Sequence, residues 1–144
     1  MSIQRNNGEI SVLTEPGAIF ESDVETGFVE LNNYKYVDFL VCSGAGTAAN
    51  TTVTIKAKTG SDGTAEAIPF TKKVGNGFVP VEATGDTLNV GGTAGECGSA
   101  IYRVDADNLA KGGFVRVSLC ATAVSGSTVP GAVMVCMYEP RYSE

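Results

Sequence analysis

Residues 51–58, "TTVTIKAK", decide the fold. Val53, Ile55 and Ala57 alternate with polar or charged residues, and this period of two is typical of a half-buried strand. The strand follows a loop, residues 44–49, that matches the G-x-G-x-x-G/A pattern of dinucleotide-binding loops. Such a loop must open a helix, because the helix N-terminus binds the pyrophosphate. Since a strand follows instead, the sequence predicts no nucleotide site here.

The segment before the loop alternates in the same way, with its apolar residues on a single face. Two such strands joined by a short loop of small residues predict a β-hairpin. A second hairpin is predicted from residues 113–124 and 132–138, which flank a connection rich in Ser, Gly and Pro. A register symmetric about Thr128 places Cys120 directly opposite Cys136. The residues expected in the shared core are Val37, Phe39, Val41, Val53, Ile55, Val117, Leu119, Val133 and Val135.

Between the two hairpins, short alternating segments are separated by glycine-rich turns. The expected strands are residues 67–73, 78–82, 87–90 and 100–106, and only residues 106–111 are expected to form a helical turn. Many short strands with frequent turns predict an all-β fold, either a single antiparallel β-sandwich or a jelly-roll-like domain. We expect this domain at residues 27–139, with an extended, polar N-terminal arm at residues 1–26 and a short tail at residues 140–144.

Composition narrows the possible partners. The chain has 144 residues, 43% of them apolar, and a net charge of −6, which fits one globular domain. Nucleic acid is disfavoured as a partner, because that binding depends on Lys and Arg neutralising phosphates. No apolar run approaches the ~20 residues that cross a bilayer, and no secretion signal is recognisable. We therefore expect synthesis in a cytosol and no membrane partner.

Catalytic motifs are missing from the sequence. There is no histidine, so Ser-His-Asp and Cys-His catalysis lack their base. Asp105 and Asp107 are the best pair of carboxylates, but their place at the end of a strand favours a turn. Leu109 and Ala110 stand where a calcium loop needs a ligand and a glycine. We expect no enzyme, no metal site and no cofactor.

Cysteines occur at positions 42, 97, 120 and 136, and no two of them form a C-x-x-C pair. A zinc site would therefore need all four thiols to converge from distant places. We interpret them as mostly structural thiols of a reducing compartment. Cys97 differs, because glycines at 95 and 98 surround it in a turn. It is the candidate for an exposed thiol that cross-links neighbouring subunits.

One segment resembles a known family. Residues 99–120, "SAIYRVDADNLAKGGFVRVSLC", contain a Val-Asp-Ala-Asp-x-Leu segment and a Gly-Phe link to the next strand. This is similar to small proteins encoded beside the major capsid gene of tailed bacteriophages. The segments "VELNNYKYVDFLV" and "TVTIKAKTGSDGTAEAIPFTKK" and the ending with Arg141-Tyr142 occur in the same order. The resemblance covers most of the chain from Gly27, in pattern more than in identity.

The resemblance implies a head decoration protein, also called a cement or auxiliary capsid protein, which binds the outside of the phage shell and reinforces it without catalysis. It implies a virion location, the major capsid protein as partner and a homotrimer. Two alternatives remain open: a tail or head–tail joining component, and a glycan-binding β-sandwich module. For the last, five tyrosines spread over strands offer weak support, since the chain has no tryptophan.

Two surfaces are predicted to make the contacts. One strand face is less polar than a solvated face should be, and such a face usually marks an interface between subunits. Its expected residues are Cys120, Met134, Cys136 and Tyr138. The N-terminal arm is expected to clasp the capsid through apolar anchors and carboxylates that suit a basic groove. The expected arm contacts are Ile10, Val12, Ile19, Phe20, Glu21 and Asp23, with Glu9, Glu15 and Glu25 adding charge.

Overall fold

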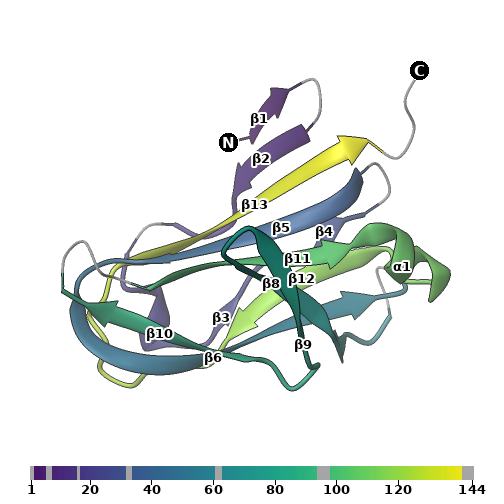
Figure 1. Ribbon diagram of the computed structural model, residues 1–144. Helices are drawn as coiled ribbons and strands as arrows, with labels where there is room; N and C mark the ends of the chain where they lie inside the picture. Colours follow the sequence, from purple (N-terminus) through teal and green to yellow (C-terminus); the bar gives the residue numbers. More distant parts are fainter. Residues whose placement is uncertain are drawn as a thin grey trace.

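A computed structural model of the protein describes residues 2–5, 8–15, 17–31, 34–60, 63–93 and 98–140. The protein is an all-β sandwich of two antiparallel sheets packed face to face (Figure 1). The seven-stranded sheet has the order β1 (Ser2–Arg5), β2 (Gly8–Val12), β13 (Gly131–Pro140), β5 (Tyr34–Ser43), β11 (Ser99–Asp105), β8 (Phe70–Val74) and β9 (Gly77–Val81).

The six-stranded sheet has the order β10 (Asp86–Gly92), β6 (Gly46–Lys58), β12 (Arg116–Ala121) and β3 (Val24–Glu25). Its two short additional strands are β4 (Val29–Glu30), which pairs with β12, and β7 (Glu66–Ile68), which pairs with β6. A 3₁₀ turn, η1 (Ile19–Glu21), and one helix, α1 (Ala106–Lys111), complete the described part of the chain.

The core lies between the two sheets and follows the alternation of the sequence. All nine residues expected in the core have no exposed surface: Val37, Phe39, Val41, Val53, Ile55, Val117, Leu119, Val133 and Val135. Tyr102 and Phe20 are the largest additional side chains that are completely buried. The predicted fold class and core are confirmed, because period-two patterning identifies which face of each strand is buried.

The predicted hairpins are wrong. β5 pairs with β13 and β11 in one sheet, whereas β6 pairs with β10 and β12 in the other. The same holds for β12 and β13, so Cys120 and Cys136 lie in different sheets and are not opposed. In both cases the two consecutive strands face each other across the core instead of pairing side by side. Alternation predicts the buried face but not the neighbouring strand, which explains the error.

The β5–β6 and β12–β13 connections, which both cross between the sheets, pack against each other, and this explains the glycine-rich loop. The backbone N–H of Gly44 donates to the carbonyl of Pro130 at 2.7 Å. A Cβ on Gly46 would lie only 2.8 Å from Cγ2 of Val129, closer than real side chains approach. Glycine is needed at these positions for close approach of two backbones, not for phosphate binding.

The N-terminal segment belongs to the sandwich. β2 pairs with β13 and so adds to the seven-stranded sheet, and β3 pairs with β12 and so adds to the six-stranded sheet. Phe20 has no exposed surface and lies in the core, with its carbonyl accepting from the N–H of Val124 at 2.8 Å. The expected boundary at residue 26 therefore does not coincide with an edge of the fold, and the segment was misjudged because it is mostly polar.

The expected helical turn at residues 106–111 is confirmed as α1. Asp105 is its N-cap, and Oδ1 of this carboxylate accepts from the N–H groups of Asp107 at 3.0 Å and Asn108 at 3.3 Å. An aspartate at this position satisfies two N–H groups that have no partner within the helix. The turn role inferred for Asp105 from the sequence is therefore the role that the structure shows.

Candidate functional site

An apolar row crosses the outer face of the seven-stranded sheet, the face that points away from the core. The strand registers place Val12 beside Met134, Met134 beside Leu40, and Leu40 beside Ile101. Val12 is 49% exposed, and the other three side chains are partly exposed. We call these four residues the apolar row. These side chains are not part of the core, and an exposed apolar row of this kind often marks an interaction surface.

The next row across the same face has a charged centre. Asp38 lies between Cys136 and Arg103 on neighbouring strands. Arg103 donates from Nε to Oδ1 of Asp38 at 2.9 Å and from Nη2 to Oδ2 at 3.2 Å, a bidentate ion pair. The Tyr138 hydroxyl donates to the same Oδ2 at 3.0 Å. Asp38 is 8% exposed, so the carboxylate is held by three hydrogen bonds and nearly removed from water.

Aromatic rings surround the guanidinium of this ion pair. The Arg103 Cζ atom lies 4.0 Å from the ring centre of Phe78, 4.6 Å from that of Tyr36 and 5.2 Å from that of Tyr138, distances at which a cation is attracted to a ring face. Burial raises the pKa of Asp38, while the hydrogen bonds and charge of Arg103 oppose that rise. The two opposite charges at the centre of the outer face thus form a hydrogen-bonded ion pair surrounded by aromatic rings.

The structure places some of the residues predicted for two different contacts on one face. Ile10 and Val12, expected to touch the capsid, lie beside Cys136 and Met134, expected to touch another subunit. Tyr138 is on the same face through its bond to Asp38. We call the surface that these residues share with the apolar row and the Asp38–Arg103 pair the outer face.

Other predicted residues lie elsewhere. Cys120 is on the six-stranded sheet beside Thr54 and Glu25, so the shared face expected for it was wrong. Burial raises the pKa of its thiol. Phe20 is a core residue, which contradicts its expected role as a capsid anchor, and Ile19 packs against that core.

The acidic residues of the N-terminal segment are solvent-facing where their side chains are described. Glu15, Glu21, Asp23 and Glu25 are exposed. Asp23 is partly engaged, since its Oδ1 accepts from the N–H of Ala123 at 2.8 Å. Cys97 and the side chain of Glu9 lie outside the described residues.

Sequence reasoning missed the middle of the outer face. Leu40, Ile101 and Asp38 were not singled out, although Leu40 and Asp38 occupy outward positions of a strand whose inward residues were predicted correctly. For Leu40 the signal was available, because it is an apolar residue at an outward position of a clearly alternating strand. What the sequence could not provide is the strand order that makes these residues neighbours of Met134 and Val12.

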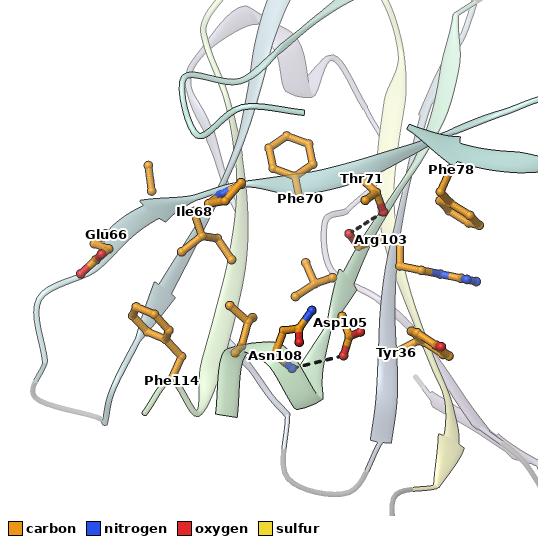
Figure 2. A pocket seen from close by; sticks show the side chains of 14 residues that line it. Tyr36, Glu66, Ile68, Phe70, Thr71, Phe78, Arg103, Asp105, Asn108 and Phe114 are labelled. Carbon is orange, nitrogen blue, oxygen red and sulfur yellow. Dashed lines mark hydrogen bonds between the residues drawn. The ribbon is translucent and has the colours of Figure 1, made fainter. Parts of the chain in front are cut away.

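A cavity of about 600 Å³ opens beside α1, between β7, the start of β8 and the end of β11. Figure 2 shows Ile68 and Phe70 on one side of it and Phe114 and Asn108 on the other, with Glu66 and Arg103 toward opposite ends. The side chains of Ile68, Phe70 and Val104 are buried, and those of Phe114 and Leu109 are partly exposed. The lining is therefore mostly apolar, with polar groups near its rim.

Neither a metal-ligating cluster nor a membrane-spanning helix occurs among the described residues. No group of three or more Cys, Asp or Glu side chains in the described ranges is arranged to hold a metal ion. Among the same residues, no helix has the length and apolar character needed to span a bilayer.

Comparison with known proteins gives a likeness in structure only. No family model matches the sequence, and no curated protein matches it. The crystal structure of the SPBc2 prophage-derived protein YomS is similar, with a TM-score of 0.56 and 13% sequence identity. The match covers 94% of this chain and 96% of that one. The chain therefore shares its fold, over nearly its whole length, with a prophage-derived protein.

Proposed function

We propose that the protein is a non-enzymatic structural component of a phage virion that binds the outside of the capsid and stabilises it. The observation that carries the proposal is the uncovered apolar row on the outer face. A prophage-derived protein with the same fold supports a phage context, and the sequence resemblance to decoration proteins supports the capsid as partner. The resemblance further implies a homotrimer, which sedimentation of the purified protein tests.

The outer face suits a large, flat partner surface. The apolar row lies on four adjacent strands, β2, β13, β5 and β11, so its residues are held in a fixed plane. The neighbouring charges of Asp38 and Arg103 already satisfy each other. Covering them costs less than covering unpaired charges, because an unpaired charge loses its water without a replacement. The exposed acidic residues near β2 and β3 would face basic residues of the shell.

A binding experiment with undecorated capsids tests this proposal. Leu40→Asp puts a charge into the middle of the apolar row, on an outward-facing position that the core does not need. A matched control is Thr54→Asp, at an outward position in the middle of the six-stranded sheet. We expect Leu40→Asp to weaken co-sedimentation with capsids at least tenfold, or about 1.4 kcal/mol, and Thr54→Asp to leave it unchanged.

Circular dichroism of both variants must match the original protein for the comparison to count. Equal binding by Leu40→Asp and the original protein would refute the use of the outer face. Copy number distinguishes the alternative virion role: decoration predicts hundreds of copies per purified particle, whereas a tail or head–tail joining component predicts far fewer.

A further inference from the structure

The cavity beside α1 exists because β8 separates from β11. β11 pairs with β5 as far as Asp105, but it pairs with β8 only at Tyr102 and Arg103. On the β8 side, Val104 and Asp105 therefore have no strand partner among the described residues. β8 turns away there because the chain passes from β7 in one sheet to β8 in the other through a single residue, Pro69. An open strand edge of this kind can pair with another chain.

The side chains around the opening would hold an apolar group. Ile68, Phe70 and Val104 form buried parts of the lining, while Leu109 and Phe114 remain partly exposed to it. Figure 2 shows Ile68, Phe114 and Asn108 around a common space. At about 600 Å³, the cavity lies in the size range of protein ligand sites, roughly 300–1,000 Å³. It is large enough for one or two large side chains.

The charges at the rim favour a basic ligand. Glu66 is exposed and Asp105 is partly exposed, and neither forms a salt bridge with a residue that the structure describes. The nearby cation, Arg103, is already bound to Asp38 and stacked on aromatic rings. Asp105 also caps α1, so the rim presents two carboxylates without a salt bridge to a described residue, of which Glu66 is the more exposed.

We propose that this cavity binds an extended peptide segment of a partner protein, with an apolar side chain in the cavity and a flanking Lys or Arg beside Glu66 or Asp105. The open edge at Val104 and Asp105 would pair with the backbone of the segment. A sugar fits less well, because Phe78 and Tyr36 stack on Arg103 and the deeper lining offers few hydrogen-bonding groups. The site goes beyond the proposed capsid contact and does not depend on it.

Three capped pentapeptides test the chemistry on the full-length protein. They are Lys-Val-Phe-Val-Lys, its acidic counterpart Glu-Val-Phe-Val-Glu, and the polar control Lys-Ser-Asn-Ser-Lys. Binding is followed by NMR through the backbone amides of residues 104–109, with maltose as a sugar probe. We expect only the first peptide to shift these amides in a saturable way.

Four variants locate the binding. Ala67→Trp fills the cavity from an exposed position on its lining and is expected to abolish the shifts. Its control, Thr87→Trp, places the same side chain at an exposed position of β10 and is expected to keep them. Glu66→Gln and Asp105→Asn remove one charge each, and asparagine still caps the helix. Each should raise the Kd about two- to fivefold, as expected for exposed ion pairs.

Four results of these experiments would count against the proposal. Equal shifts with the acidic peptide, or binding that survives Ala67→Trp, would overturn the proposal. So would saturation by maltose without any peptide binding, or no shift with any probe at millimolar concentration. None of these results bears on capsid binding through the apolar row, because none of its four residues lines the cavity.

Discussion

Replacing Phe20 by alanine tests whether the N-terminal segment is part of the core. The side chain has no exposed surface, and its ring packs so closely on Gly131 that a Cβ at that glycine would overlap it. The N–H of Gly131 also donates to the carbonyl of Gly17 at 2.8 Å, which fixes the entry of η1 to the start of β13. Phe20 thus connects the first twenty residues to the last strand.

The expected cost follows from burial. A buried phenylalanine removes roughly 150–250 Å² from water, and truncation to alanine in a core costs about 3–5 kcal/mol. For a domain of this size that corresponds to a decrease in Tm of about 10–15 °C. Urea unfolding followed by circular dichroism measures the free energy, and differential scanning calorimetry measures Tm.

Glu21→Ala provides the matched control, because it changes an exposed residue of the same 3₁₀ turn. Its expected effect is within about 0.5 kcal/mol. A loss below about 1 kcal/mol for Phe20→Ala would refute the reasoning, since a segment that merely rests on the surface would lose little when truncated. The same result would restore the picture of a separate N-terminal arm.

Four further predictions have definite expected results. Asp38→Ala leaves the guanidinium of Arg103 without its partner in a poorly hydrated place, so we expect urea unfolding to show a loss of about 2–4 kcal/mol. Arg116→Ala, which removes an exposed ion pair, should cost less than about 1 kcal/mol in the same assay. Burial raises the pKa of the Cys120 thiol, so its alkylation at neutral pH, followed by mass spectrometry, should be slower in the folded than in the urea-unfolded protein; equal rates would contradict this. Burial and the nearby Asp86 raise the pKa of Tyr102 far above the ordinary value of 10.0. The folded state therefore holds the hydroxyl proton more tightly than the unfolded state, so the free energy of unfolding should fall as pH rises above about 10. Tyrosinate absorbance from Tyr102 should appear only when the protein unfolds.

Side-chain alternation made the buried faces predictable. Val53 and Ile55 on one strand and Val133 and Val135 on another were placed in the core from sequence alone, and all four have no exposed surface. Helix α1 was equally predictable, because an aspartate before a short run of helix formers marks its start. These features are local, and local patterns determine them.

Strand order was not predictable by the same means. The alternation of residues is the same whether Val41 and Val53 lie on paired strands or face each other across the core. The outer face was not predicted from the sequence for this reason, since Met134 and Leu40 become neighbours only through the pairing of β13 with β5. Phe20 was misplaced because its surroundings are polar, and a single buried ring has no period to reveal it.

The position of β13 in the seven-stranded sheet affects how the protein is made. This strand is synthesised after every other described strand, yet it lies between β2 and β5 and supplies Met134 to the middle of the apolar row. A ribosome delivers the chain from its N-terminus, so β2 and β5 cannot join one sheet until β13 has been made. A nascent chain that ends before residue 131 lacks the strand that brings Val12 and Leu40 together. The apolar row therefore forms only after β13 has been synthesised.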